Sequence, residues 1–402
     1  MFVKCMKKLL QINVDSALFS CGKICEAISI VAQSNGWNTY VAYARDRKAG
    51  VNKEIKIGSI MDVYLHWAEQ KIFDNEGLCS RGATNKLVNT IKDLNPDIIH
   101  LHCIHDHYIN YEILFKYLSS IDTPVVWTQH DSWNITGHCY HFVSANCDRW
   151  KTRCYDCPLI HEYPNNLLDR SSKNYLQKKK AFSSKDNLTL VSCSQWLDNY
   201  LGQSFLQNKS HLVIHNGIDT NVFHPTKTKK SDRFIILGVA IPWTKAKGVD
   251  DFYKLRELLP EDEYVIVMVG LSSNQLKSLP AGIIGIERTH DVAELVDLYS
   301  SANVLINATY ADNFPTVNIE ALACGTPVIT YNTGGSPEAI DDKTGIVVQQ
   351  GDVQGLANAI KLMQSTPFSS KLCRDRAKKF FNKDNCFKKY IKLYNELLLN
   401  KK

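Results

Sequence analysis

Short apolar runs alternate with longer amphipathic segments, and this rhythm occurs twice along the chain. In the first half the strand-like runs are 8–14, 39–43, 97–102, 124–129, 188–192 and 211–214, with helical patterns at 24–35 and 87–94. In the second half they are 234–239, 264–269, 304–307 and 327–330, with helical patterns at 249–259, 292–300 and 318–324. Such alternation is typical of a parallel sheet covered by helices. The sequence therefore predicts an α/β protein with two doubly wound domains.

The length and one polar segment indicate where these domains divide. A chain of 402 residues exceeds the size at which a single hydrophobic core usually stops growing. Residues 225–232 have the composition of a linker, and a strand-like run follows them directly. We therefore expect an N-terminal domain over 1–219, a linker over 220–232 and a second domain over 233–372. Residues 373–402 are expected to form helices that pack back on the N-terminal domain.

The charge pattern argues against a nucleic-acid partner. The net charge of +6 is modest for this length, and the lysine-rich runs at 178–180, 227–230 and 401–402 are short. No aromatic residues interleave with them, which favours solvated surface. The sequence shows neither a run of about 18 apolar residues nor a secretory signal at its start. We expect a cytoplasmic protein whose thirteen cysteines stay reduced or bind metal.

The densest chemical signal lies between residues 307 and 338. A strand is expected to end at Asn307, followed by a loop with Asp312 and Phe314 and by a helix that opens near Pro315 without a strong capping side chain. Backbone N–H groups at such a helix start attract phosphate. Glu320 lies within this helix, and an ionised carboxylate can accept hydrogen bonds from both hydroxyls of a ribose. The pattern therefore suits the nucleotide end of a ligand.

These residues also carry a family resemblance. Seven residues separate Asp312 from Glu320, and two motifs follow them, Gly325-Thr-Pro-Val and Gly334-Gly-Ser-Pro-Glu. This combination resembles the donor-site signature of glycosyltransferase family 4. Elsewhere, Asn216-Gly-Ile-Asp resembles the family's interdomain boundary, and Lys247-Gly-Val resembles its diphosphate-binding turn. The likeness covers most of the chain and is strongest in the second half.

The resemblance implies a fold, a reaction and partners. The family has the GT-B fold, in which two Rossmann-like doubly wound domains face an interdomain cleft. It implies a retaining glycosyltransferase that passes a sugar from a nucleotide-diphosphate sugar to an acceptor hydroxyl. The implied donor is a UDP- or GDP-sugar, and the implied acceptor is a glycan or a lipid-linked molecule in surface polysaccharide or lipid-linked glycan biosynthesis. With a lipid-linked acceptor, peripheral contact with the inner face of the membrane would follow.

Roles for residues of the second domain also follow from the resemblance. Glu320 would hold the donor ribose, and Asp312 stands where the family usually has a glutamate that contacts the sugar hydroxyls. Because aspartate is shorter, this contact shifts toward the backbone amides at Phe314 or Thr316. Pro315 completes the donor-binding segment. Helix capping is the alternative role for Asp312.

Two lysines precede the first helix of the second domain. Lys247 would neutralise the departing diphosphate, which is the main electrostatic demand of the reaction. The arginine that the family usually carries a few residues earlier is missing, and Lys245 either replaces it or is exposed to solvent. Because the diphosphate itself can take the acceptor proton, the resemblance implies neither a pair of catalytic carboxylates nor a catalytic metal.

In the first domain, His130 follows an apolar strand-like run. This places it at the carboxyl end of a strand, where open α/β sheets bind ligands. It resembles the family's active-site histidine that faces the donor sugar, and a structural histidine is the alternative. Asp131 is expected to orient the loop. Gly22, in the segment 20–23, marks either a close approach of backbone to a phosphate or a simple turn.

A separate cysteine cluster interrupts the first domain at about 137–158. Cys139, Cys147, Cys154 and Cys157 lie within nineteen residues, and the last two form a Cys-x2-Cys pair. Four thiols can close a tetrahedral structural zinc site, and free or redox-active thiols are the alternative. His138 and His141 are alternative ligands.

Two other functions remain open on the sequence alone. Another GT-B enzyme of nucleotide sugars, an epimerase or a hydrolase, could use the same donor site. A non-catalytic sugar-nucleotide-binding partner in a glycan assembly complex is suggested by the missing arginine and by aspartate at position 312. Acceptor-dependent turnover separates these functions from a transferase.

Overall fold

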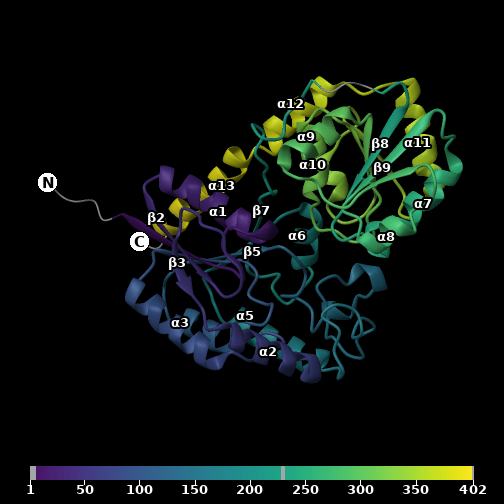
Figure 1. Ribbon diagram of the computed structural model, residues 1–402. Coiled ribbons are helices and arrows are strands. Elements are labelled where there is room, and N and C mark those ends of the chain that lie inside the picture. The colour runs from purple at the N-terminus through teal and green to yellow at the C-terminus, as the bar shows by residue number, and fades with distance from the viewer. Residues whose placement is uncertain (1–5, 228–230, 401–402) are drawn as a thin grey trace. The chain divides into compact units, whose positions relative to one another are not determined.

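The computed structural model describes residues 6–227 and 231–400, and in it the chain forms two compact units (Figure 1). Unit 1 extends to Ile214 and includes the chain again from Phe387, and unit 2 comprises His215–Cys386. Residues 228–230, which belong to the expected linker and one lysine-rich run, lie outside the described residues. So do Lys401 and Lys402.

Unit 1 is built on a seven-stranded parallel sheet in the order β3-β2-β1-β4-β5-β6-β7. Its strands are β1 (Lys7–Ile12), β2 (Trp37–Tyr43), β3 (Lys53–Lys56), β4 (Ile98–Leu101), β5 (Val125–Gln129), β6 (Leu188–Ser192) and β7 (Ser210–Val213). Its helices are α1 (Phe19–Ser34), α2 (Ile60–Phe73), α3 (Arg81–Leu94), α4 (Tyr111–Leu118), α5 (Ser171–Ser183), α6 (Gln195–Leu201) and most of α13 (Lys383–Leu399). The central strands are buried along their whole length, as expected of a parallel sheet covered on both faces.

Unit 2 has a six-stranded parallel sheet in the order β10-β9-β8-β11-β12-β13. Its strands are β8 (Phe234–Val239), β9 (Tyr264–Val269), β10 (Ile283–Ile286), β11 (Val304–Asn307), β12 (Val328–Tyr331) and β13 (Gly345–Val348). Its α-helices are α7 (Val249–Leu258), α8 (Ser273–Lys277), α9 (Val292–Ser301), α10 (Thr316–Ala323), α11 (Val353–Ser365) and α12 (Ser370–Phe380). The prediction of two doubly wound parallel sheets is thus confirmed.

Some elements differ from the sequence-based expectation. The strands β3, β10 and β13 were not expected: each is only four residues long, β3 is mostly charged, and β10 and β13 each contain a glycine. Helix α1 begins at Phe19 rather than near Ile24, so Gly22 lies inside a helix and not in a turn. An added Cβ at Gly22 would lie 3.3 Å from the Asp15 carbonyl oxygen and the Ala17 nitrogen, so glycine here lets α1 pack closely on the loop after β1.

The last helix completes the core of unit 1. The Tyr394 hydroxyl lies 2.7 Å from His100 Nδ1, and the Tyr390 hydroxyl lies 3.0 Å from Thr128 Oγ1. His100 Nε2 in turn lies 2.8 Å from Thr128 Oγ1, and all four side chains are buried. Helix α13 therefore supplies a partner for the other ring nitrogen of His100 on β4 and a further contact for Thr128 on β5.

One lysine of the 178–180 run is not at the solvated surface that the sequence suggested. Lys178 is buried, and its ammonium donates to the carbonyls of Trp133 (2.7 Å) and Thr136 (3.1 Å). The same nitrogen lies 3.6 Å from the centroid of the Trp133 ring, a cation–π contact. Burial lowers the pKa of Lys178 to about 7. Its neighbours Lys179 and Lys180 are exposed, as predicted.

Within residues 6–227 and 231–400, no helix combines the length and apolar character needed to cross a bilayer.

Candidate functional site

The strand order of unit 2 reverses between β8 and β11. In open α/β sheets the carboxyl ends of the strands flanking such a reversal are where ligands bind. The 3-10 turn η3 (Lys245–Lys247) follows β8, and the loop 308–315 follows β11. The topology therefore brings the two segments that the sequence singled out to one edge of the same sheet.

Lys247 and Asp312 meet at this edge. Lys247 Nζ lies 2.6 Å from Asp312 Oδ2, and the two side chains are 34% and 22% exposed. This ion pair is partly exposed to solvent, so an arriving anion can contact the ammonium. Lys245, on the same turn, is exposed.

Backbone contacts hold the η3 turn against the loop after β11. The Tyr310 amide donates to the Ala246 carbonyl at 2.8 Å. Gly248 has a positive φ of 76°, and an added Cβ would lie 2.2 Å from the Ala308 carbonyl oxygen. Only glycine fits this close approach, so the Lys-Gly pair fixes the position of Lys247 through its backbone.

A second glycine supports Asp312 from the other side. Gly334, in the loop after β12, has a φ of 57°, and an added Cβ would lie 1.7 Å from the Asp312 carbonyl oxygen. Gln350 Nε2 also donates to the Tyr310 carbonyl at 3.0 Å. The sequence analysis used Gly334 only as part of a motif, and the signal for its function is the Gly-Gly pair itself.

Helix α10 opens beside this loop, as predicted. Pro315 is its N-cap residue and gives no side-chain cap, and the Asn318 amide donates to the Pro315 carbonyl at 3.3 Å. A helix start of this kind carries a partial positive charge and suits a phosphate. Phe314 is buried, with its ring 4.8 Å from that of His215, so its backbone rather than its side chain is available to a ligand.

The Glu320 carboxylate accepts a hydrogen bond from a buried tyrosine. The Tyr299 hydroxyl on α9 donates to Glu320 Oε2 at 2.9 Å. Burial raises the pKa of Tyr299 well above its usual range, and the charge of Glu320 adds to this effect, so Tyr299 stays a donor. This contact orients the carboxylate, and no motif in the sequence indicated it.

In unit 1 the strand order reverses between β1 and β4, and histidines gather at this point. His102 Nε2 lies 2.9 Å from Gln11 Oε1, and His102 Nδ1 lies 3.1 Å from His130 Nε2. Gln11 Nε2 donates to the Cys25 carbonyl, which identifies Oε1 as the acceptor facing His102. His102 therefore carries its proton on Nε2, and its Nδ1 accepts from His130 Nε2–H.

Cys21 borders the other side of His130. Cys21 Sγ lies 3.4 Å from Cys103 Sγ. The hydrogen bond from Cys103 and the charge of His130 lower the pKa of Cys21 well below its usual range. Burial opposes the charging of His130, but Cys21 and Asp131 together raise its pKa. The sequence analysis missed Cys21 and His102, because neighbouring strands, not neighbouring residues, bring them to His130.

Asp131 orients this loop, as the sequence suggested. Its Oδ1 accepts from the Trp133 amide at 2.8 Å, and its Oδ2 lies 2.8 Å from His105 Nε2. Burial opposes the ionisation of Asp131, yet the charge and hydrogen bond of His105 hold its pKa at about 2. Asp131 is thus fully engaged by neighbours from its own unit.

Two groups of three donor atoms within 4.8 Å of one another occur in the described residues: His66, Glu76 and His107, and Cys103, His105 and Asp131. Each contains a histidine–carboxylate pair, His107 with Glu76 and His105 with Asp131. His66 Nε2 accepts from the Gly77 amide at 3.2 Å, and its Nδ1 bonds to Ser80. These groups are therefore explained by contacts within the protein.

The four cysteines of the predicted cluster are separate from these groups. Cys139, Cys147, Cys154 and Cys157 lie in the loop between β5 and α5 of unit 1.

Two protein families match the chain. Residues 33–222 match the family described as Glycosyltransferase Family 4, and residues 232–365 match Glycosyl transferases group 1. Together these regions include the whole sheet of unit 2 and the sheet of unit 1 apart from β1.

Among relatives, the D-inositol 3-phosphate glycosyltransferase of Arthrobacter sp. (strain FB24) is 31% identical over 288 residues. The match spans 64% of this chain and 68% of the relative. A protein of Escherichia coli (strain K12) named as the colanic acid biosynthesis glycosyl transferase WcaC is 22% identical over 339 residues. That match spans 79% of this chain and 80% of WcaC.

Solved structures share the architecture of both units. Sucrose-phosphate synthase from Thermosynechococcus elongatus has a TM-score of 0.70 at 17% identity, covering 98% of this chain and all of that one (100%). Anabaena Alr3699/HepE in complex with UDP has a TM-score of 0.66 at 13% identity, covering 97% and 100%. The Anabaena protein is also known with UDP and glucose and with UDP-glucose. At these identities the likeness shows the fold, which is the predicted GT-B architecture.

Proposed function

Because the chain belongs to glycosyltransferase family 4, we propose that it transfers a sugar from a nucleotide-diphosphate sugar to an acceptor hydroxyl with retention of anomeric configuration. That it is a glycosyltransferase with two Rossmann-like units follows from its family and fold. The observation that carries the finer proposal is the Lys247–Asp312 pair on the loop that leads into α10, a helix that starts without a side-chain cap and carries Glu320.

Unit 2 supplies a site for the nucleotide end of the donor. Glu320, oriented by Tyr299, accepts the ribose hydroxyls. The first-turn amides of α10, from Thr316 on, and the Lys247 ammonium contact the diphosphate, with Lys245 as a second cation on the same turn. When the donor binds, the Asp312 carboxylate releases Lys247 and accepts hydrogen bonds from hydroxyls of the sugar. The UDP complexes of the Anabaena protein support UDP as the nucleotide, with GDP as the alternative.

The reaction needs charge stabilisation more than an added acid or base. The acceptor oxygen forms a bond to the anomeric carbon on the face from which the diphosphate departs, and the bond from that carbon to the phosphate oxygen breaks. The acceptor proton passes to the departing diphosphate oxygen. Lys247 stabilises the negative charge that develops there. In unit 1, a contact of His130 with the donor sugar and a phosphate contact at Gly22 both stay predictions.

An assay of the purified protein with UDP- and GDP-sugars and glycan or lipid-linked acceptors tests this function. We expect nucleoside diphosphate to be released only when an acceptor is present, and the product to keep the anomeric configuration of the donor by NMR. Release without an acceptor would indicate a hydrolase. An epimerised sugar nucleotide would indicate an epimerase, and binding without turnover would indicate a non-catalytic partner.

The surface of α2 supports a lipid-linked acceptor. This helix has an inverted pattern: apolar side chains, among them Met61, Tyr64, Leu65 and Ile72, are exposed, whereas His66 and Gln70 are buried. The exposed Leu167 lies beside the end of the helix, where its amide donates to the Lys71 carbonyl at 3.1 Å. An exposed apolar helix face of this kind suits the interface of a bilayer.

Basic residues adjoin this apolar face. Helix α5 begins where α2 ends, since the Arg170 amide before α5 donates to Asp74, the C-cap residue of α2, at 3.0 Å. Lys173, Lys179 and Lys180 are exposed on α5. Each lysine near an anionic leaflet contributes about 1 kcal/mol to binding. We therefore propose that α2 and α5 rest on an anionic membrane surface that carries the acceptor.

Leu65→Glu is expected to weaken membrane binding severalfold, because a carboxylate replaces an apolar contact and is repelled by anionic lipid. Co-sedimentation with vesicles of phosphatidylglycerol and phosphatidylcholine measures this effect. Leu362→Glu, at a leucine of α11 that is also exposed, is the control and should bind like the wild type. Turnover of a water-soluble acceptor should stay unchanged in both. A dimer that Leu65→Glu dissociates, without vesicle binding by the wild type, would assign the α2 face to a second copy of the chain.

A further inference from the structure

We propose that the loop between β5 and α5 holds a zinc ion bound by the thiolates of Cys139, Cys147, Cys154 and Cys157, with His138 as a supporting residue. The loop runs from 130 to 170, and its only helical segments are η1 (Val143–Ala145) and η2 (Arg149–Lys151). A segment of this length with so little regular structure needs another source of order. A bound metal supplies it, because metal binding adds directly to folding free energy.

The four thiols line one small cavity. Its walls also include His138, Phe142 and Trp150, and its volume is about 10 Å³. This is close to the space that a single water molecule or ion occupies. The thiols are not among the groups whose donor atoms already lie within 4.8 Å of one another, so binding draws them together by side-chain rotation. The cavity therefore has the size for one ion and the ligands that zinc prefers.

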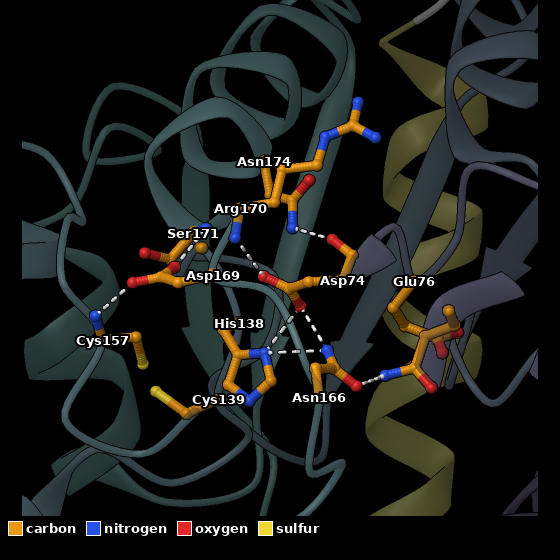
Figure 2. A network of polar contacts seen from close by, with 12 residues as sticks. Asp74, Glu76, His138, Cys139, Cys157, Asn166, Asp169, Arg170, Ser171 and Asn174 are labelled. Carbon is orange, nitrogen blue, oxygen red and sulfur yellow. Dashed lines mark hydrogen bonds and ion pairs between the residues drawn. The ribbon is translucent and has the colours of Figure 1, made fainter. Parts of the chain in front are cut away.

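The buried side chain of His138 independently points to a ligand at this cavity. Its side chain is fully buried, and its Nδ1 lies 2.7 Å from Asp74 Oδ1. Its Nε2 is buried and has no hydrogen-bond partner. Figure 2 shows the His138 ring beside Asp74, with the thiols of Cys139 and Cys157 facing each other nearby. Leaving a buried imidazole nitrogen without a partner is costly, and an imidazolium that donates Nδ1–H to Asp74 and Nε2–H to a metal-bound thiolate removes this cost.

A buried positive charge behind this loop also favours a zinc–thiolate centre. A zinc ion with four thiolates carries a net charge of −2, which needs compensation in a buried setting. Lys178 is buried behind this loop and bonds to the carbonyls of Trp133 and Thr136. Among the described residues it has no ion-pair partner. The charge of Asp74 acts on it most strongly, followed by the charges of Cys154 and Cys139. The proposed centre adds a second source of negative charge beside this ammonium.

The backbone already supports the thiols. The Gly137 amide donates to Cys154 Sγ at 3.2 Å, an N–H···S contact that stabilises a thiolate. Arg149 donates to the carbonyl of Tyr155, at 2.7 Å, and to that of Asp156, both between Cys154 and Cys157. The Cys157 amide donates to Asp169 Oδ2 at 2.6 Å. These contacts fix the Cys-x2-Cys turn whether or not the metal is bound.

Metal analysis of the full chain, purified without added metal, tests the proposal. We expect about one zinc per chain, since four thiols complete one tetrahedral site. Cys154→Ser should lose most of this zinc, whereas Cys324→Ser, at a buried cysteine of unit 2, should keep it. As a second measurement that does not require a folded variant, Co²⁺ added to metal-free wild type should give the absorption of a tetrahedral thiolate site. A zinc-free protein that gives no such absorption would refute the site.

Two further outcomes would also overturn the assignment. If thiol titration of unreduced, denatured protein finds fewer than the thirteen cysteines of the sequence and no zinc, the cluster forms disulfides instead. His138→Ala is expected to keep zinc but release it to a chelator about 10- to 100-fold faster, the effect typical of losing an outer-sphere partner. If His138→Ala loses zinc while Cys147→Ala keeps it, His138 is a ligand and the four-thiol set is wrong.

Discussion

Lys247→Ala is expected to lower kcat/KM for the donor by about 100- to 1000-fold, the range found when one group that stabilises a developing oxyanion is removed. The effect should fall mainly on kcat, because the negative charge on the diphosphate grows as the bond to the sugar breaks. Asp312, which lies 2.6 Å from the lysine, would then face the diphosphate without its counter-charge. Steady-state kinetics with saturating acceptor measure the loss.

Two other lysines make this test specific. Lys361→Ala, at an exposed position on α11, should leave kcat/KM unchanged. Lys245→Ala tests whether Lys245 replaces the arginine that the family usually carries. A rise in the donor KM would show that Lys245 contacts the diphosphate, and no change would show that it is only solvated. Wild-type turnover by Lys247→Ala, with the fold intact by circular dichroism, would remove Lys247 from the site.

Glu320→Ala is expected to raise the donor KM by about 100-fold or more. Hydrogen bonds to a charged group contribute about 1.5–3 kcal/mol each, and the carboxylate is proposed to accept two from the ribose. Glu320→Gln keeps one acceptor oxygen and should lose less. Isothermal titration with the nucleoside diphosphate alone measures the same loss without turnover. Unchanged nucleotide binding in Glu320→Ala would place the ribose elsewhere.

Tyr299 provides the control for stability. In Glu320→Ala its buried hydroxyl loses its acceptor at 2.9 Å, which should cost about 1–3 kcal/mol of unfolding free energy. Adding Tyr299→Phe removes the unsatisfied hydroxyl and should recover part of this stability. Nucleotide binding should not recover. Recovery of both together would mean that the variant had lost activity only through unfolding.

The sequence predicted the parts of the fold and site that depend on local pattern. The alternation of apolar runs gave both sheets, and the start of α10 near Pro315 was placed correctly. Both of these features depend on periodicity and capping, which are properties of neighbouring residues. Lys247 and Asp312, which the structure brings into contact, were selected by the family resemblance.

Features that depend on packing between distant segments could not be predicted in this way. The lysine at 178 reads as surface, because its neighbours in sequence are polar, yet Trp133 and Thr136 bury it. The proton position on His102 depends on Gln11, ninety-one residues away. The support of Asp312 by Gly334 depends on a loop from the next strand. Each of these follows from the order of strands in the sheet, which no single segment contains.

The two tyrosines of α13 have a consequence for how the chain folds as it leaves the ribosome. Domains usually fold in the order in which they are synthesised. Here unit 2 is synthesised completely before Tyr390 and Tyr394 are added, and these residues fill the polar gaps around His100 and Thr128. We therefore expect the core of unit 1 to be completed only after Tyr390 and Tyr394 have been synthesised.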